Sequence, residues 1–212
     1  MKTLLVDDFV SGIKKITECI IENEVYFCEL DSHAGDGDFG MSLAKGFKII
    51  RDEWETLERT DIGTFLKSCG MIIYENCGGA SGPIWGSGFN AAARYAKGKR
   101  ELSFAELSEM LQASIDKIQK LGGAKLGDKT LLDTFIPAVE SLKQSAAENK
   151  ELPGLISDLV KAAEQGAENT KSIAAVKGRA SYVGERSIGF PDAGALALSI
   201  IIKVAAGPVP VI

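Results

Sequence analysis

Histidine is nearly absent from this sequence, because His33 is the only one among 212 residues. A single histidine excludes histidine-rich zinc sites and any proton relay between two histidines. Basic residues are also in short supply, since 24 lysines and arginines stand against 29 acidic residues, for a net charge of −5. Proteins that bind nucleic acid normally carry a basic excess. We therefore expect no nucleic-acid partner, and any phosphate ligand must be neutralised by cations or by backbone dipoles.

Cysteine pairs and long apolar runs are missing as well. The four cysteines are scattered without a CxxC motif, which favours buried thiols in a reducing compartment over a disulfide framework. The N-terminus lacks a signal-peptide pattern. The longest apolar run, 193–206, is too short to span a bilayer and is interrupted by polar residues. The sequence thus predicts a cytoplasmic protein with no membrane partner.

The chain does contain strong helical periodicity. Apolar residues recur three or four positions apart in eight segments, and no alternating run flanked by hairpin turns predicts a strand. Thr60 and Asp61 offer an N-cap for the third helix, Ser103 and Glu106 form a predicted capping box, and Pro137 should kink the sixth helix if that helix is continuous. We predict an all-α fold in one domain over residues 1–212, a bundle or closed helical barrel. The predicted helices cover about 8–30, 41–57, 61–73, 83–98, 103–118, 130–149, 152–175 and 192–205.

Glycine is concentrated between the predicted helices. Many of the 23 glycines fall in four segments, at 35–40, 78–88, 122–127 and 178–194. A helical bundle needs only about one glycine for each helix C-cap. These loops therefore look built to bring backbone close to a ligand, and flexible turns without a ligand are the alternative.

The first glycine-rich loop carries three aspartates, Asp31, Asp36 and Asp38. Each pair of carboxylates held at about 5 Å would cost roughly 3 kcal/mol at an effective dielectric of about 20. A hard divalent cation such as Mg²⁺, Ca²⁺ or Mn²⁺ removes that cost. An EF-hand is excluded, because Phe47 stands where its bidentate glutamate should be. The loop predicts a carboxylate metal site.

The other three segments suit an anionic ligand. Residues 78–83 precede a helix and predict an anion-binding nest with the Ser81 hydroxyl as a donor. Residues 122–130 fail as a P-loop, because Asp128 separates Gly127 from Lys129. That segment is either a different nucleotide loop or an ordinary cap, with Asp128 as N-cap and Leu131 packed inward. In the fourth segment, Arg179 and Arg186 are candidate phosphate ligands, although either could instead pair with Glu185 at the surface.

Together these segments resemble the L subunit of dihydroxyacetone kinase. The matching pieces are Asp31 with 35–38, residues 78–83, residues 127–130 with Asp133, and residues 178–182 through 184–189. Their order and spacing cover nearly the whole chain. The resemblance implies an antiparallel eight-helix barrel whose loops at one end hold a nucleotide.

The resemblance also assigns residues to each part of that site. Asp31, Asp36 and Asp38 would hold two Mg²⁺ ions, which reduce the charge of about −6 on ADP and three carboxylates to about −2. No side chain has a covalent role, since the chemistry is positioning and charge neutralisation. ADP or ATP would be bound by Phe39, Gly40, Met41, Ser42, Ala80, Ser81, Gly122, Gly123, Leu131, Arg179, Asp192, Ala193 and Gly194.

Two positions depart from the family pattern. Phe39 stands where the family usually has histidine, so a polar contact near the phosphates is lost. Ala193 stands where the family commonly has proline, and this change should matter little. His33 is not at the family's histidine position, and we interpret it as a loop residue.

The chain length leaves no room for a substrate-binding K domain, so the resemblance implies the separate-subunit form. In that form, bound ADP accepts a phosphoryl group from a phosphohistidine protein of the phosphoenolpyruvate-dependent phosphotransferase system. The γ-phosphoryl then passes to dihydroxyacetone on the K subunit. Two alternatives stay open: a kinase subunit for a related short ketose, and a regulatory module without transfer activity that docks on a transcription regulator or the K subunit.

Overall fold

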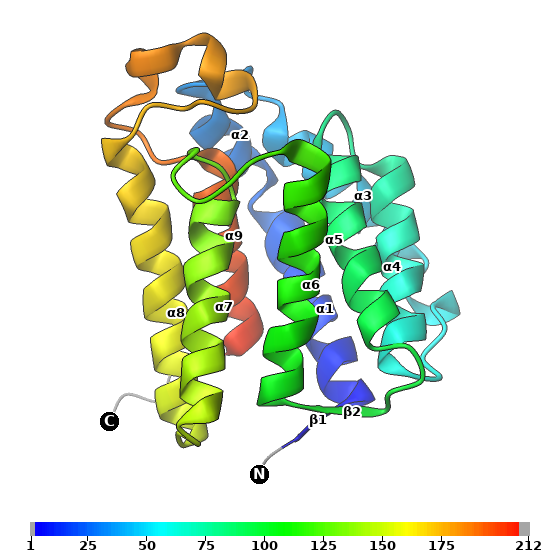
Figure 1. Ribbon diagram of the computed structural model, residues 1–212. Helices are drawn as coiled ribbons and strands as arrows, with labels where there is room; N and C mark the ends of the chain where they lie inside the picture. Colours follow the sequence, from blue (N-terminus) through cyan, green and yellow to red (C-terminus); the bar gives the residue numbers. More distant parts are fainter. Residues whose placement is uncertain (1–2, 208–212) are drawn as a thin grey trace. The chain divides into compact units, whose positions relative to one another are not determined.

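The computed structural model describes residues 3–207, which are mostly helical (Figure 1). The all-α class is confirmed, but the described residues form nine α-helices instead of eight. Along residues 3–207, no helix combines the length and apolar character needed to cross a bilayer. The helices are α1 (Val6–Glu22), α2 (Glu24–Ser32), α3 (Phe39–Asp52), α4 (Ile62–Asn76), α5 (Ser81–Tyr95), α6 (Phe104–Gly122), α7 (Leu132–Ala147), α8 (Leu152–Asn169) and α9 (Ala193–Ala206). The strands are β1 (Thr3–Leu5) and β2 (Glu101–Ser103), and the 3₁₀ helices are η1 (Trp54–Thr56), η2 (Thr170–Ser172), η3 (Arg179–Tyr182) and η4 (Gly184–Ser187).

The chain divides into two compact units. Unit 1 comprises Met1–Glu24 and Met41–Gly123, and unit 2 comprises Val25–Gly40 and Ala124–Ile212. Each unit is assembled from two separate stretches of sequence, because the segment that contains α2 groups with α7, α8 and α9. The single domain over residues 1–212 and the closed barrel stay predictions.

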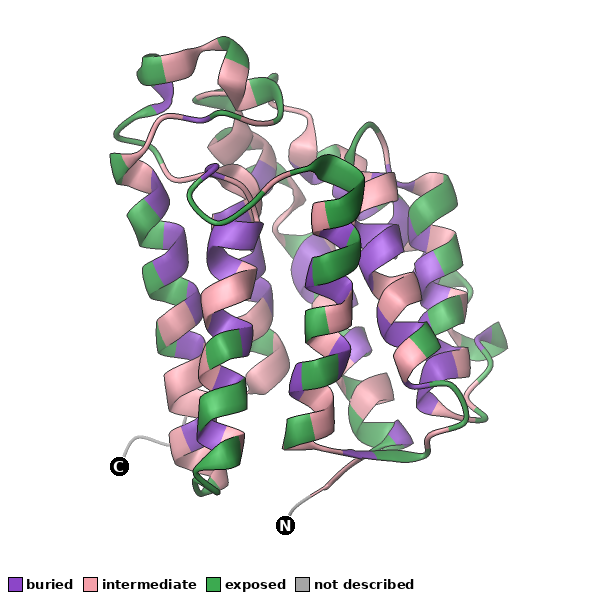
Figure 2. Ribbon diagram, in the orientation of Figure 1, coloured by how far each residue is buried: buried purple, intermediate pink, exposed green. Residues whose placement is uncertain are grey.

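Close packing of α4 and α5 organises unit 1. A Cβ at Gly86 would lie 2.7 Å from the backbone of Tyr74, and a Cβ at Gly82 would lie 2.9 Å from the Tyr74 carbonyl oxygen. Because glycine has no Cβ, the two helix backbones approach more closely than other residues would allow. On α4, Phe65, Cys69 and Ile73 are buried at the predicted helical spacing. Buried and exposed residues alternate along the helices (Figure 2).

The two strands contradict the expectation that the sequence holds none. β1 pairs with β2 in antiparallel fashion, with Leu4 opposite Leu102. Each strand has three residues, which is too short for an alternating pattern to be recognised in the sequence. Since β1 leads directly into α1 and β2 into α6, the pair ties the starts of these two helices together.

Unit 2 has its own close helix contact, between α7 and α8. Pro137 lies inside α7 and has no N–H, so it leaves the Asp133 carbonyl without its helical donor. Gly166 of α8 lies against this carbonyl, since a Cβ there would be 2.3 Å from the Asp133 oxygen. The helix is continuous through Pro137, and the kink stays a prediction.

Several predicted helix ends can be compared with the structure. Asp61 caps α4 by accepting a hydrogen bond from the Thr64 N–H at 2.9 Å, and Ser103 and Glu106 form the capping box of α6, so both predictions are confirmed. The single helix predicted over 8–30 is wrong. Its break is at Asn23, whose side-chain amide donates to the Cys19 carbonyl at 2.8 Å between α1 and α2.

The four cysteines, all within the described residues, form no disulfide. Cys19, Cys69 and Cys77 are buried, and burial raises the pKa of Cys69 to about 12 and that of Cys77 to about 11. These thiols stay protonated at neutral pH, so they behave as small apolar groups in the core of unit 1.

Candidate functional site

The three loop aspartates converge in unit 2. Asp31 lies near the C-terminus of α2, and Asp36 and Asp38 follow in the loop before α3. One carboxylate oxygen from each lies within 4.8 Å of the others. The predicted convergence is therefore confirmed, and this group is called the acidic cluster below.

Two glycines shape the loop around Asp31. The Gly37 N–H donates to the Asp31 carboxylate at 2.9 Å, and Gly37 has a φ of +75°, which favours glycine. A Cβ at Gly35 would lie 2.1 Å from Asp31 Oδ1, so a larger residue there would displace the carboxylate. The glycines thus fix the carboxylate that anchors the acidic cluster.

Arg179 of η3 supplies positive charge to the acidic cluster. Its guanidinium forms an ion pair with Asp36 and lies 3.9 Å from the Asp38 carboxylate. The sequence predicted a phosphate contact for Arg179 but not this pairing with aspartates. One guanidinium against three carboxylates leaves a net charge of −2, so the cluster still attracts cations.

The donor set of the acidic cluster fits a hard divalent cation. All three side chains offer carboxylate oxygens, which Mg²⁺ prefers, and they are at most half-buried, which leaves room for water and phosphate oxygens as further ligands. Mg²⁺ commonly keeps several waters and binds through one or two carboxylates and substrate phosphates. The arrangement therefore suits a metal–phosphate complex better than a closed structural metal site.

Two acidic side chains order the loop that precedes α7. The Asp133 carboxylate accepts hydrogen bonds from the Gly127 and Thr130 N–H groups, both at 2.7 Å. Asp128 accepts from the Lys125 N–H at 2.9 Å. The predicted N-cap role of Asp128 is wrong, because α7 begins at Leu132 after the cap Leu131. Leu131 itself is half-buried, and the next residue is the one packed in the core.

Asp192 is the N-cap of α9. Its carboxylate accepts a hydrogen bond from the Ala195 N–H at 2.7 Å, and its own N–H donates to the Thr170 hydroxyl at 2.9 Å. Burial raises the pKa of the Asp192 carboxyl to about 7, and the negative charges of Asp133 and Asp31 add to that rise. The predicted Asp192–Gly194 turn thus sits in the electrostatic surroundings of the acidic cluster.

Gly194 connects this turn to the loop before α7. A Cβ at Gly194 would lie 3.5 Å from the Leu131 Cβ and 3.2 Å from Asp192 Oδ1. The predicted nucleotide residues Leu131, Asp192 and Gly194 are therefore close to one another in unit 2, with Ala193 between the last two as the first residue of α9.

In unit 1, the structure brings two other predicted segments together. The Gly78 N–H donates to the Ser42 carbonyl at 2.9 Å, and a Cβ at Gly78 would lie 2.7 Å from the Ser42 hydroxyl. Ala80 and Ser81 follow at the N-terminus of α5, where no side chain caps the helix. This terminus leaves backbone N–H groups of the kind that bind phosphate.

The remaining predicted residues lie at helix ends. Phe39 and Gly40 open α3, with the Phe39 ring 6.2 Å from that of Phe27, and the exposed Met41 follows them. Gly122 and Gly123 close α6, and Gly123 adopts the left-handed conformation (φ +63°) as its C-cap. The proposed ligand roles of these five residues stay predictions.

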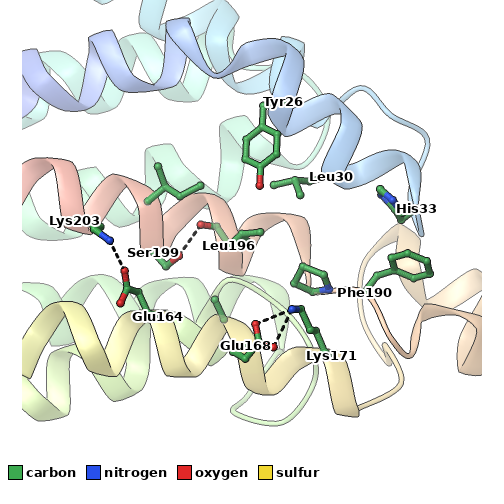
Figure 3. Close-up of a pocket in the computed structure, with 13 residues that line it drawn as sticks. Tyr26, Leu30, His33, Glu164, Glu168, Lys171, Phe190, Leu196, Ser199 and Lys203 are labelled. Carbon is green, nitrogen blue, oxygen red and sulfur yellow. Dashed lines mark hydrogen bonds and ion pairs between the residues drawn. The ribbon is translucent and has the colours of Figure 1, made fainter.

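His33 is separate from the acidic cluster. It follows α2 directly, is exposed, and stacks its ring 4.5 Å from that of Phe190. Both rings line a cavity of about 530 Å³ between α2, α8 and α9 of unit 2 (Figure 3). The two lysines of this cavity are ion-paired, Lys171 with Glu168 at 2.8 Å and Lys203 with Glu164 at 2.7 Å. None of the predicted ligand residues lines it.

The burial of Lys129 was not expected from the sequence. Its side chain is buried, although lysine is among the residues least often found inside proteins. The sequence held one indication that this lysine is unusual: it stands in the glycine-rich segment 122–130, but not at the position that a P-loop requires.

Comparisons with known proteins show the family of this chain. The family model described as the DAK2 domain matches residues 33–207. The ADP-binding subunit DhaL of the PEP-dependent dihydroxyacetone kinase of Escherichia coli (strain K12) is 38% identical over 181 residues, which are 85% of this chain and 86% of that subunit. The ADP-binding subunit DhaL of the PEP-dependent dihydroxyacetone kinase 2 of Listeria innocua is 39% identical over 198 residues, 92% of this chain and 91% of that subunit.

A solved structure extends the likeness to the fold. The dihydroxyacetone kinase of C. freundii, crystallised in complex with AMP-PNP and Mg²⁺, matches with a TM-score of 0.74 and 25% identity. The match covers 93% of this chain and 33% of that kinase, so this chain spans about a third of its length. The chain therefore belongs to the DAK2-domain family, together with the ADP-binding subunits of PEP-dependent dihydroxyacetone kinases.

Proposed function

We propose that this chain is the ADP-binding subunit of a phosphoenolpyruvate-dependent dihydroxyacetone kinase, a phosphotransferase. The observation that carries the proposal is the acidic cluster, in which three carboxylates converge in a chain of the DAK2-domain family. Such a cluster is unfavourable in the absence of a cation and favourable around a metal–diphosphate complex. The coverage of the E. coli and Listeria subunits supports a role for the whole chain.

Asp31, Asp36 and Asp38 would hold two Mg²⁺ ions, which would supply positive charge to offset that of the phosphates during phosphoryl transfer. The chain's own contribution is placement. Gly35 and Gly37 keep the Asp31 carboxylate in position, and Arg179 adds a guanidinium suited to phosphate oxygens. The C. freundii kinase complex with AMP-PNP and Mg²⁺ supports a magnesium–nucleotide ligand.

The other predicted residues would bind the nucleotide. In unit 1, the Ser42 segment and the uncapped N-terminus of α5 at Ala80–Ser81 offer donors to phosphate. In unit 2, Leu131 and the Asp192–Gly194 turn offer an apolar contact and a carboxyl group. Phe39, Gly40, Met41 and the Gly122–Gly123 pair complete the proposed set.

The proposed partners follow from the chemistry of the relatives. Bound ADP would accept a phosphoryl group from a phosphohistidine protein of the phosphotransferase system, and a K subunit would present dihydroxyacetone. Both partners would work in the cytoplasm, and the four free cysteines support the same location for this chain. Docking on a transcription regulator is a further proposed role.

A related short ketose is the second candidate substrate. Phe39 stands where the resemblance expects histidine, and its ring packs with Phe27 instead of offering a polar group. Phosphorylation of a panel of short ketoses, with the K subunit present, separates the candidates: activity on dihydroxyacetone alone eliminates this alternative. Tight Mg-ADP binding without any single-turnover transfer from ATP would favour the regulatory module instead.

The binding proposal is tested by Asp36→Asn, which removes one charge from the acidic cluster with little change in shape. We expect calorimetry to give an ADP affinity in Mg²⁺ lower by about 100-fold or more, because a metal ligand is weakened. Without Mg²⁺ and nucleotide, the melting temperature should change little, because repulsion within the cluster also falls. The matched control is Asp52→Asn, another exposed aspartate paired with an arginine, which should bind ADP normally.

Two results would contradict the proposal. One is wild-type protein, cleared of nucleotide, that fails to bind ADP in Mg²⁺. The other is an Asp36→Asn variant with unchanged affinity and a lowered melting temperature, which would identify Asp36 as a turn residue only.

A further inference from the structure

Lys129 is buried in unit 2 with every hydrogen-bond donor used. Only 1% of the residue is exposed, although it lies in the loop between α6 and α7. Its ammonium donates to three backbone carbonyls: Ile173 at 3.1 Å, Ser187 at 2.7 Å and Phe190 at 2.8 Å. These acceptors are 44 to 61 residues away along the chain, so the ammonium joins two distant loops.

The acceptors have a clear arrangement along the chain. Ile173 stands just before residues 174–189, the Arg179 segment, while Ser187 and Phe190 stand at its end. This segment contains η3, η4 and the guanidinium that pairs with Asp36 and Asp38. A single side chain therefore holds the beginning and the end of the Arg179 segment together.

Other hydrogen bonds also join the two ends of the Arg179 segment, a region called the neck below. The Ala175 N–H donates to the Ser187 hydroxyl at 2.9 Å, and the Gly189 N–H donates to the Lys171 carbonyl at 2.8 Å. The Val176 N–H also donates to the Asp128 carbonyl at 3.3 Å, whereas the hydrogen bonds that η3 and η4 make internally reach only three residues along the chain. Local turns of this kind do not by themselves fix where the segment sits.

Local backbone preference does not explain a lysine at this position. Lys129 has a φ of +60°, a conformation that glycine or asparagine adopts more easily. Burial also disfavours the ammonium and lowers the pKa of Lys129, an effect that the charge of Asp192 opposes. The strain of the positive φ and the burial of the ammonium are offset by the three hydrogen bonds that Lys129 makes at the neck of the Arg179 segment.

We propose that Lys129 is a positioning residue that closes the neck of the Arg179 segment and so holds Arg179 at the acidic cluster. Its importance for nucleotide binding rests on the proposed function, whereas its control of the segment does not. The three hydrogen bonds of the Lys129 ammonium go to residues outside the acidic cluster. It acts through Arg179.

The first experiment measures the segment without any ligand. Lys129→Met keeps most of the side-chain length and removes the three donors. We expect amide hydrogen exchange in peptides covering 174–189 to quicken by about tenfold or more, while peptides of α7 and α8 change little. The matched control is Lys125→Met, an exposed lysine of the same loop, which should leave exchange unchanged.

The second experiment separates positioning from a general loss of structure. Lys129→Met should weaken Mg-ADP binding about tenfold in the wild-type background, but less than twofold in an Arg179→Met background. This non-additivity is expected only if the two residues act in series. If wild-type protein binds no Mg-ADP, the proposed function fails while the exchange result still tests the neck.

A third variant guards against misfolding of Lys129→Met. Ser187→Ala removes the other side-chain hydrogen bond of the neck and should quicken exchange in the same peptides by a smaller factor. Unchanged exchange in 174–189 for both variants would overturn the proposal. Additive losses of affinity for Lys129→Met and Arg179→Met would overturn it too.

Discussion

Among the described residues, unit 1 buries only hydroxyl groups as its polar side chains, whereas unit 2 also buries Asp128, Lys129 and Asp133. In unit 1, the Thr17, Ser87 and Ser108 hydroxyls donate to carbonyls three or four residues earlier in their own helices. These bonds are local, whereas the buried Ser114 hydroxyl donates to the Gly88 carbonyl 26 residues away and so joins α6 to α5.

Two buried polar groups of unit 2 reach partners still farther away along the chain. Lys129 reaches carbonyls of another loop, and the Thr134 hydroxyl donates to the Ala195 carbonyl 61 residues away. A buried charge is costly unless it is paired or fully hydrogen-bonded. Unit 2 accepts that cost at residues 128–133, where Lys129 bonds to both ends of the Arg179 segment, so its stability and its candidate site share these contacts.

Glycine contacts offer the strongest test of this difference. A Cβ at Gly63 of unit 1 would lie 2.5 Å from the Lys97 backbone nitrogen, and a Cβ at Gly166 of unit 2 would lie 2.3 Å from the Asp133 carbonyl oxygen. We expect Gly63→Ala and Gly166→Ala each to lower the free energy of unfolding by about 3 kcal/mol, because the backbones must move apart. Urea denaturation followed by circular dichroism measures this loss.

The two variants should then differ in ligand binding. Asp133 holds the loop 127–130 by hydrogen bonds, so Gly166→Ala should also weaken Mg-ADP binding of the folded protein, whereas Gly63→Ala should not. Gly12→Ala is the control, because a Cβ there meets nothing within 4 Å and should stabilise α1 by about 0.5–1 kcal/mol. Equal ADP affinities for Gly63→Ala and Gly166→Ala would contradict the expectation that helix packing in unit 2 affects ligand binding.

The next test uses pH. Burial raises the pKa of Asp192 to about 7, so the folded state holds a proton that the unfolded state releases near pH 4. The contribution of Asp192 to stability is therefore fully present at low pH and is lost as pH rises from about 4 to 7. We expect Asp192→Asn, which can still cap α9, to remove this part of the pH dependence.

Urea midpoints of wild-type and Asp192→Asn protein, measured from pH 4 to 8 in EDTA, check this expectation. The variant should gain stability relative to wild type as pH rises, since it never carries the buried charge. A constant difference across this range would mean that the Asp192 carboxyl is ionised throughout and solvated in the folded state.

The features that were predictable from sequence are those encoded within a few residues. Asp61 and the Ser103–Glu106 box were found because capping depends on residues three apart. The convergence of Asp31, Asp36 and Asp38 was predictable for the same reason, since eight positions and two glycines are enough to bring carboxylates together. The break at Asn23 was missed, because helical periodicity continues across it from α1 to α2.

The long-range part of the candidate site was not predictable from one sequence. Arg179 meets Asp36 across 143 positions, and Lys129 meets Phe190 across 61. Pairings of this kind depend on how α7, α8 and α9 pack, which no local pattern records. The error at Asp128 has a similar cause. Aspartate is a common capping residue, but here the Asp133 carboxylate accepts the Thr130 N–H and α7 begins only at Leu132.

The smallest expected effect comes from a charged cap of unit 1. Hydrogen bonds from Lys99 and Ser103 lower the pKa of Glu106 to about 2, so its contribution to stability is present above about pH 4.5 and is lost as pH falls toward 2. Glu106→Gln keeps the capping box but removes this slope, which is opposite in sign to that of Asp192. Because the Glu106–Lys99 pair is about a third exposed, we expect its contribution to the free energy of unfolding to be only a few tenths of a kcal/mol, screened by salt.

Thermal unfolding of wild-type and Glu106→Gln protein from pH 2 to 6, in low and high salt, measures this difference. A pH dependence as large as that of Asp192 would show that the stability of unit 1 also depends on charge.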